Sequence, residues 1–257
     1  MSSTAAKWEA ILGELERRRA FGQSMGGEDK LARHAQAGKL NARQRLAALF
    51  DDGAFVEIGA FTGVLSEAGP APAPADAFVA GFGKVDGRPV LAGAEDFTVL
   101  GGSIGTAAAD KRYRLTEIAA RERLPLVFML EGAGHRPTNS HDGRTPNDLQ
   151  ALAALSGLVP LVCLVMGASA GHGALTAPMC DFVAMTKQAA IFAAGPPLVK
   201  AAIGEVVTKE ALGGPDVHVM QSGLVHNLAE DDAAAIALAR TYLSYFPGNA
   251  WDAAPVR

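Results

Sequence analysis

The sequence predicts an α/β protein in which helices cover both faces of a sheet. From residue 105 onward, helix-like segments alternate with strand-like segments along the chain. The expected strands are short, unbroken apolar runs, typical of strands that are buried on both sides. Of the 257 residues, 49% are hydrophobic and 19% are charged, so the chain has enough apolar side chains for one large domain or two small ones.

The first 50 residues are expected to be helical. Trp8, Ile11, Leu12 and Leu15 have the spacing i, i+3, i+4, i+7, which predicts an amphipathic helix that ends at a Gly-Gly pair, residues 26–27. A second, shorter helix is expected over 42–50. In the segment 68–76 proline alternates with small residues, which excludes a helix or a central strand and predicts an exposed extended loop.

A hairpin is expected next, with strands over 78–85 and 88–94 joined by Asp86-Gly87, a favoured two-residue turn. The remaining elements follow from apolar periodicity and from glycine or proline at their ends. Helices are expected over 105–123, 146–155, 197–203 and 231–246, and strands over 125–130, 161–166, 182–186 and 190–193.

Charge and composition exclude several classes of protein. The chain has 23 Lys+Arg and 27 Asp+Glu, a net charge of −4, without a basic block, so a nucleic-acid partner is not expected. The most apolar stretch, 158–168, is much shorter than the ~20 residues that span a membrane. Cys163 and Cys180 lie in apolar surroundings without ligand spacing. We therefore expect a cytoplasmic protein without a disulfide framework, a membrane anchor or a metal.

Three glycine-rich turns lie where expected strands lead into helices, which is where α/β proteins bind ligands. They are Gly101-Gly102-Ser103, the run from Gly132 to Arg136, and the run from Gly167 to Ala174. Glycine lets backbone N–H groups approach a ligand, so two adjacent turns can hold one developing oxyanion. The alternative is that the glycines only form tight turns. None of the turns matches a dinucleotide fingerprint or a phosphate loop.

Histidines in these turns are the acid–base candidates. His135 and His172 are candidates because imidazole titrates near neutral pH, although either could instead be a hydrogen-bonded residue at a loop edge. His135, His141 and Asp142 share a polar loop, but their spacing matches no recognised metal site.

Ser169 leaves a hydrolase interpretation open. It is the central residue of Gly-Ala-Ser-Ala-Gly, which matches the nucleophile-elbow pattern G-x-S-x-G. His218 or His226, with Asp216 or Asp181, could complete a triad in that interpretation.

Several longer segments carry a more specific signal. GKLNARQRLAALFDDGAFVEIG (38–59), GKVDGRPVLAGAEDFTVLGGSIG (83–105) and GASAGHGALTAPMCDFVAM (167–185) resemble the carboxyltransferase (beta) subunit of biotin-dependent acyl-CoA carboxylases of the propionyl-CoA/methylmalonyl-CoA type. So do AAGPPLVKAAIGEVVTKEALGG (193–214), HVMQSGLVHNLAEDD (218–232) and LSYFPGNAWDAAPVR (243–257). The resemblance runs in order over nearly the whole chain and corresponds to the N-terminal half of the family's subunits.

The resemblance implies a single domain with the crotonase-like ββα superhelix, in which residues 1–50 are a helical entry segment and 51–257 the core. It also implies a CoA thioester as substrate and transfer of a carboxyl group between carboxybiotin, carried on a partner protein, and the α-carbon of an acyl-CoA. In the family the N-terminal half mainly holds CoA and the C-terminal half mainly receives biotin. We therefore expect an oligomer with a C-terminal-type carboxyltransferase subunit, a biotin carrier and biotin carboxylase.

The resemblance also implies roles for individual residues. The amides of Ala133, Gly134 and His135 are expected to hold the enolate oxyanion, although the family often has Gly-Gly-Ala-Arg in this turn. His172 stands where the family commonly has a small residue, so the acyl preference cannot be carried over. Contacts to acyl-CoA are expected from Gly132, Gly171, His172, Gly173, Gly101, Gly102 and Ser103, and contacts to its phosphates from Lys39, Arg43 and Arg45.

Alternative interpretations remain open at this point. One is a self-sufficient crotonase-fold decarboxylase, hydratase or thioesterase that uses His135 or Glu131, and another is a CoA-binding assembly subunit without turnover. The three cations can equally be solvated surface charges. The apolar residues of the last expected helix, such as Ile236 and Leu243, can cover a second domain or pack on their own.

Overall fold

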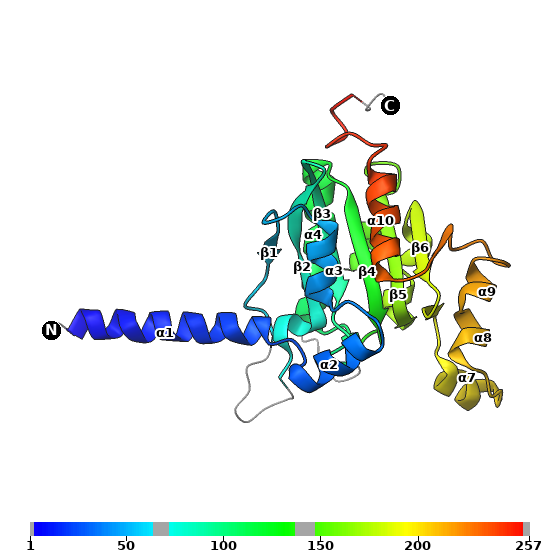
Figure 1. Ribbon diagram of the computed structural model, residues 1–257, viewed down its shortest axis with the longest axis horizontal. Helices are drawn as coiled ribbons and strands as arrows, with labels where there is room; N and C mark the ends of the chain where they lie inside the picture. The colour runs from blue at the N-terminus through cyan, green and yellow to red at the C-terminus, as the bar shows by residue number, and fades with distance from the viewer. Residues whose placement is uncertain (1–2, 64–71, 137–146, 254–257) are drawn as a thin grey trace.

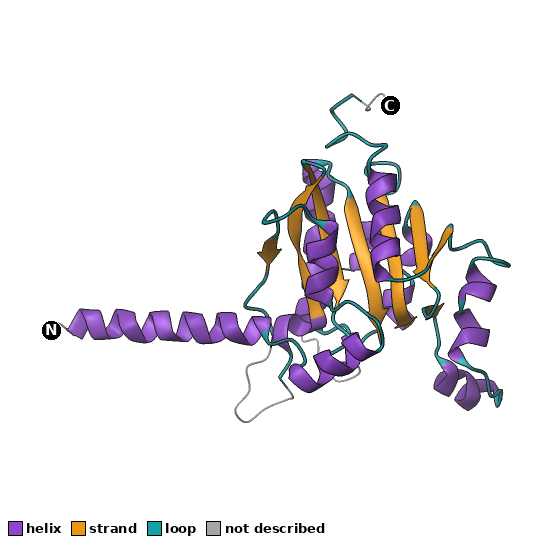
Figure 2. Ribbon diagram, in the orientation of Figure 1, coloured by secondary structure: helices purple, strands orange, loops and turns teal. Residues whose placement is uncertain are grey.

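The computed structural model describes residues 3–63, 72–136 and 147–253. Within these ranges eight strands form one mixed sheet in the order β1-β2-β3-β4-β5-β6-β8, and β7 pairs with β5 (Figure 2). The strands β1, β2 and β3 are antiparallel, and the others pair in parallel. The strand bounds are β1 Val56–Ile58, β2 Phe78–Val85, β3 Arg88–Glu95, β4 Leu126–Gly132, β5 Leu161–Ala170, β6 Phe182–Thr186, β7 Ala190–Phe192 and β8 Asn227–Ala229.

Helices cover both faces of the sheet, as the sequence predicts. On one face α3 and α10 contribute Leu46, Leu49 and Ile236 to the core, and on the other α4 contributes Leu115 and Ala119 (Figure 1). The α-helices are α1 Ser3–Gln23, α2 Glu28–Gln36, α3 Ala42–Leu49, α4 Thr106–Glu122, α5 Asp148–Ala153, α6 Gly171–Ala174, α7 Pro196–Ile203, α8 Lys209–Gly213, α9 Pro215–His218 and α10 Asp232–Leu243.

The expected hairpin is confirmed with its turn. β2 and β3 pair from Phe78↔Glu95 to Val85↔Arg88. Asp86 and Gly87 have φ values of 50° and 78°, as a turn with two left-handed residues requires. The carboxylate of Asp51 accepts hydrogen bonds from both turn amides, at 3.1 and 2.8 Å, so the end of α3 is fastened to the hairpin.

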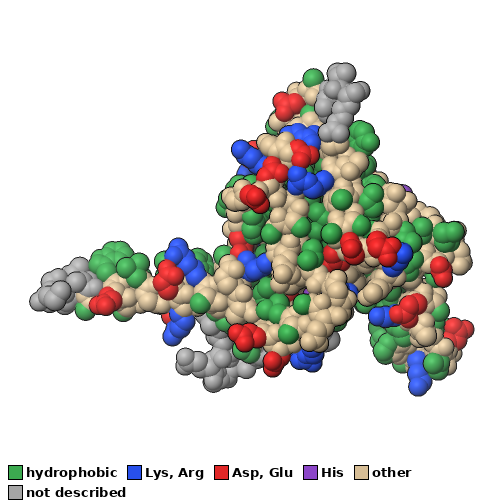
Figure 3. All heavy atoms as spheres, in the orientation of Figure 1, with side chains coloured by type: hydrophobic (Ala, Val, Ile, Leu, Met, Phe, Trp, Pro, Cys, Tyr) green, Lys and Arg blue, Asp and Glu red, His purple; other side chains and the backbone are tan. Residues whose placement is uncertain are grey.

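The exposure of two segments differs from what their sequence patterns usually indicate, and for the second of them the expected exposed loop was wrong in part. The apolar side of α1 is not buried, because α1 extends away from the sheet and its Trp8 is 60% exposed (Figures 1 and 3). The loop expected over 68–76 is partly outside the described residues, but its last part belongs to a buried 3₁₀ turn, Pro74–Ala77. The ammonium group of Lys111 donates to the carbonyl oxygens of Ala75 and Phe78, which holds this turn against α4.

Two further elements, β5 and α10, differ from the sequence-based expectation or decide between its alternatives. β5 continues to Ala170, four residues beyond its expected end, because residues 168–170 pair with β7. α10 packs on its own domain, where Ile236 and Leu243 are buried and Ala233 faces solvent. The last helix therefore does not present its apolar side to a second domain.

Candidate functional site

The three glycine-rich turns meet at one edge of the sheet. β4 and β5 are parallel neighbours with Gly132 paired to Ser169, so both turns leave the sheet at the same edge. Ala133 N–H donates to Gly101 O at 3.0 Å, which joins the first turn to the second. A Cβ atom added to Gly134 would lie 2.7 Å from Ala170 O and 3.5 Å from Gly171 Cα. The expected adjacency of the second and third turns is confirmed.

The backbone at the centre of this edge offers an amide for a ligand. Gly134 has φ +81°, a left-handed conformation that glycine adopts without strain, and its N–H has no hydrogen-bond partner among the described residues. The Ala133 amide, expected as a second oxyanion donor, is already bound to Gly101 O. The structure therefore favours Gly134 over Ala133 as the donor. The side chain of His135, the third expected residue, is exposed beside this turn.

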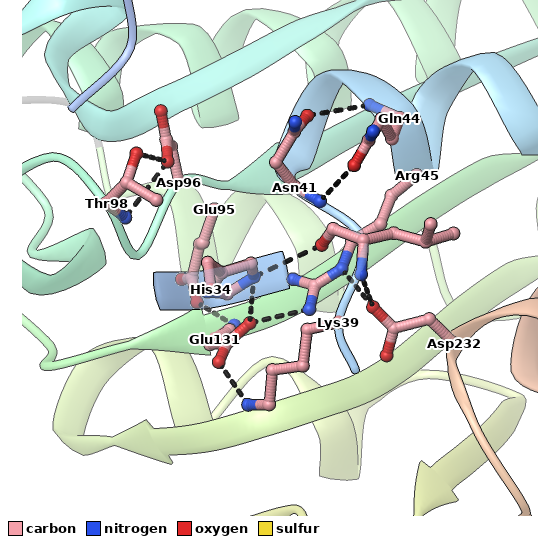
Figure 4. Close-up of polar contacts among 11 residues, drawn as sticks. His34, Lys39, Asn41, Gln44, Arg45, Glu95, Asp96, Thr98, Glu131 and Asp232 are labelled. Carbon is pink, nitrogen blue, oxygen red and sulfur yellow. Dashed lines mark hydrogen bonds and ion pairs between the residues drawn. The ribbon is translucent and has the colours of Figure 1, made fainter. Parts of the chain in front are cut away.

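Buried charges hold the base of the second turn (Figure 4). Glu131, at the end of β4, forms ion pairs with Lys39 and, at 2.6 Å, with Arg45. Arg45 Nε also donates to Asp232 at 2.8 Å, and the guanidinium is 1% exposed. Both carboxylates that bind Arg45 are buried inside the domain, so Arg45 is not placed to meet a CoA phosphate. It ties α3 and α10 to the site instead.

The environment of Glu131 argues against a role as a catalytic base. Burial alone would raise the pKa of this carboxyl, but the positive charges and hydrogen bonds of Arg45 and Lys39 lower it below its ordinary value. Glu131 is therefore ionised and fully engaged. Arg43, another expected phosphate contact, binds Glu57 at 2.8 Å and the carbonyl oxygen of Gly22.

A cavity with cationic walls lies beside Glu131. Its volume is about 370 Å³. It is lined by Lys30, Arg33, His34, Ala37, Lys39, Phe97, Thr98 and Glu131. Lys30 and Arg33 were not among the expected site residues, because they lie on α2, where the sequence has no glycine-rich turn and no recognised motif. Of the three cations expected at the phosphates, only Lys39 lines this cavity.

A second buried cluster supports the third turn. His172 Nε2 lies 2.6 Å from Asp148 Oδ1. Arg112 donates to Asp148 Oδ2 at 2.7 Å and to Thr176 Oγ1 at 2.5 Å. The His172 ring also meets the His135 ring edge-on, with 4.4 Å between centroids. Sequence reasoning missed Arg112 and Asp148, because each lies on a helix far along the chain from the turn that it supports.

Glu95 lies directly beneath two of the turns. Its Oε2 accepts from Glu131 N at 2.8 Å. A Cβ atom added to Gly132 would lie 2.4 Å from Gly102 O and 2.8 Å from Glu95 Oε2, so this position needs glycine, and one added to Gly173 would lie 2.9 Å from Glu95 Oε1. Burial raises the pKa of Glu95 to about 7, against the opposing charge of Arg112.

The hydrolase interpretation does not fit this geometry. Ser169 is 0% exposed in β5, and its Oγ has no hydrogen-bond partner. A nucleophile elbow instead places its serine on an exposed turn next to a histidine. His218 is bound to Ser222 and to Ile191 O. Among the residues that the structure describes there is no group of three potential metal ligands and no helix long and apolar enough to cross a membrane; His141 and Asp142 lie outside them.

Comparison with known proteins identifies the family. Residues 33–257 match the carboxyl transferase domain. The chain belongs to the carboxyl transferase family. It is 36% identical over 250 residues to the methylmalonyl-CoA carboxyltransferase 12S subunit of Propionibacterium freudenreichii subsp. shermanii, a match that covers 95% of this chain and 48% of that protein. The chain spans about half the length of the curated relatives it matches.

Solved structures place this carboxyl transferase domain in the crotonase-like fold, as the resemblance implied. The transcarboxylase 12S hexamer with bound methylmalonyl-coenzyme A matches with a TM-score of 0.85 and 34% identity, over 96% of this chain and 49% of that one. A chain of the Pseudomonas malonate decarboxylase hetero-tetramer matches with a TM-score of 0.69 and 26% identity. That match covers 79% of this chain and 81% of the other, which has a similar extent.

Proposed function

We propose that this carboxyl transferase domain is the acyl-CoA-binding half of a biotin-dependent acyl-CoA carboxyltransferase. The observation that carries the proposal is the convergence of the turns at Gly101, Gly132–Gly134 and Gly171–Gly173 around the Gly134 amide, which has no partner in the part of the chain that the structure describes. Removing a proton or a carboxyl group from the α-carbon of a thioester leaves an enolate whose negative charge gathers on the carbonyl oxygen. A fixed amide donor suits that charge.

The residues of this chain bind and orient the thioester in the proposed reaction. Gly134 N–H donates to the thioester oxygen, and the Gly171–Gly173 turn leaves room for the pantetheine arm because neither glycine carries a side chain. Loss of one such donor typically costs ~2.7–4 kcal/mol of transition-state stabilisation. Carboxybiotin supplies the carboxyl group when a partner presents it.

The cationic cavity beside Glu131 is our proposed site for the CoA phosphates. Lys30, Arg33 and Lys39 line it, and no carboxylate among the described residues pairs with Lys30 or Arg33. The ammonium group of Lys39 also donates to Glu131, so Lys39 links the proposed phosphate site to the glycine turns. Arg43 and Arg45 are then supporting residues rather than phosphate ligands.

Biotin reaches the proposed site on a partner. The second, C-terminal-type carboxyltransferase half is supplied by another chain, together with a biotin carrier and biotin carboxylase, in an oligomer. Support comes from the malonate decarboxylase chain, which has a similar extent and belongs to a hetero-tetramer, and from the hexameric assembly of the 12S relative.

Calorimetric titration with propionyl-CoA tests the binding half of the proposal. The purified chain should bind it, and Gly134→Ala should weaken binding at least ~10-fold, because the added methyl group meets Ala170 O and displaces the turn. Gly157→Ala is the matched control. Gly157 has φ +75° but open space around it, so an alanine there introduces the same kind of backbone strain without the steric clash. Absence of binding by the unmodified chain, or equal loss in both variants, would refute the proposed site.

A further inference from the structure

We propose that His172, oriented by Asp148, is a proton carrier at the acyl site that lets this chain exchange the α-proton of an acyl-CoA with water in the absence of biotin. The inference rests on the proposed function, since it needs a bound thioester. It goes beyond that function, since carboxyl transfer from carboxybiotin does not require a basic side chain of this domain.

The first support is the way in which the imidazole is held. Asp148 is 4% exposed and Arg112 is 1% exposed, yet the His172 side chain keeps 20% of its surface in contact with solvent. Arg112 is itself fixed, because it donates to both Asp148 and Thr176. A buried ion pair thus holds Nε2 of a ring that stays partly accessible to solvent. This is how a base is oriented when a carboxylate supports a histidine.

The ionisation of Asp148 defines the tautomer. Burial alone would raise its pKa, but the hydrogen bond from His172 and the charge of Arg112 hold the pKa of this carboxyl at about 2. Asp148 is therefore an acceptor at neutral pH, and the 2.6 Å contact requires Nε2 of His172 to carry a proton. In the neutral imidazole, Nδ1 is then left with a lone pair, as a base needs.

The second support is the position of the ring next to the proposed oxyanion donor. His172 follows Gly171, whose Cα lies 3.5 Å from the place of a Cβ on Gly134. The ring also contacts His135, which directly follows Gly134. A thioester whose oxygen is bound by the Gly134 amide thus places its reactive end between these two turns, beside the imidazole.

The proposed step is balanced without another reagent. The Cα–H bond of the acyl group breaks, its proton goes to Nδ1 of His172, and its electron pair moves to the thioester oxygen, where the Gly134 amide holds the enolate. The imidazolium exchanges its proton with water, and return of a proton to Cα regenerates the thioester. In D₂O the net result is replacement of α-hydrogen by deuterium.

The test follows deuterium incorporation into propionyl-CoA in D₂O by mass spectrometry, with the purified full chain and no biotin. The unmodified chain should exchange the α-hydrogen faster than buffer. His172→Ala should slow exchange by ~10²–10⁴-fold, and added imidazole should restore part of the rate. Asp148→Asn should also slow exchange, because an amide no longer requires the productive tautomer. The matched control is His226→Ala, which should exchange normally: His226 directly precedes β8, and its Nδ1 accepts from Val183 N–H of β6, away from the turns.

Binding of propionyl-CoA, measured by calorimetry on the same samples, separates the two proposals. Without binding by the unmodified chain, the proposed function fails and this inference falls with it. Three outcomes would overturn this inference and leave the proposed function standing. The unmodified chain could bind propionyl-CoA without exchanging its α-hydrogen, or His172→Ala could exchange it at the normal rate. The third outcome is slowed exchange by His172→Ala that added imidazole does not restore. If His172→Ala does not bind, Asp148→Asn decides: binding with slowed exchange supports the proton carrier, and normal exchange overturns it.

Discussion

At the scale of single residues, buried charge organises the site, and the sequence could not predict it. Glu95, Arg112 and Glu131 look like surface residues in a one-dimensional pattern, since charged side chains are rarely fully buried. Each is at most 2% exposed. Their partners come from distant parts of the chain, so only the folded structure brings them together. The glycines of the turns were predicted, because their function depends on local backbone geometry.

Glu95→Gln should change how stability depends on pH. Folded Glu95 holds its proton up to a pKa of about 7, while the unfolded carboxyl ionises near 4.5. The contribution of Glu95 to the unfolding free energy of the wild type is therefore fully present below pH 4.5, and it is lost as pH rises toward 7. The stability of the variant relative to wild type should rise over this interval by up to about 3 kcal/mol and then level off.

Urea unfolding of both proteins at pH 5, 6, 7 and 8 measures this difference. Other groups titrate in both proteins and cancel in the comparison. A difference that does not vary with pH would show that Glu95 ionises normally in the folded protein.

Arg45→Met should destabilise the chain strongly. The substitution leaves Asp232 without its guanidinium partner and removes one of the two cations from Glu131. Breaking a buried ion pair typically costs about 3–5 kcal/mol of unfolding free energy. The control is Arg121→Met, since Arg121 pairs with Glu122 at the surface and should matter by no more than about 0.5 kcal/mol. Equal effects of the two substitutions in denaturant unfolding would contradict the assigned role of Arg45.

At the scale of elements, strong local signals were predicted and weak ones were missed. The hairpin of β2 and β3 has a specific turn, and β4 and β6 are apolar runs, so their positions were expected. β1 and β8 have only three residues each, too few for a recognisable pattern. α2 has mostly charged and polar residues, and none of its residues is fully buried. The end of β5 consists of small residues with low strand propensity, and only its pairing with β7 makes it a strand.

α1 shows that a correct helix prediction does not fix what the helix packs against. Its apolar residues Ile11 and Leu12 are 56% and 55% exposed. The spacing that usually marks a buried face therefore marks, in this chain, a face without a partner inside the domain.

Substitution of this face should leave the domain intact. Ile11→Gln with Leu12→Gln should change the unfolding free energy of the monomer by no more than about 0.5 kcal/mol, because neither side chain is buried in the single chain. The comparison substitution Leu46→Ala on α3 should cost about 2–5 kcal/mol of unfolding free energy, since Leu46 is 0% exposed. Thermal unfolding in dilute solution compares them. A large loss from the α1 substitutions would mean that this helix packs on the body of the domain.

At the scale of the whole molecule, one sheet edge carries all the chemistry that we assign to the chain. The turns that we propose for the thioester, the His172–Asp148 pair and the cationic cavity lie around the ends of β4 and β5, next to α2 and α6. We propose that this arrangement binds and activates an acyl-CoA. In our account it does not by itself receive carboxybiotin, which the second half of the carboxyltransferase is proposed to do.

Carboxyl transfer assayed with and without the partner is the most direct test of this account. The measurement follows transfer of a labelled carboxyl group from methylmalonyl-CoA to free biotin. It is made first with this chain alone and then after addition of the C-terminal-type carboxyltransferase subunit. The account predicts no transfer by the chain alone and transfer once the partner is present. Full transfer by the pure single chain would contradict it.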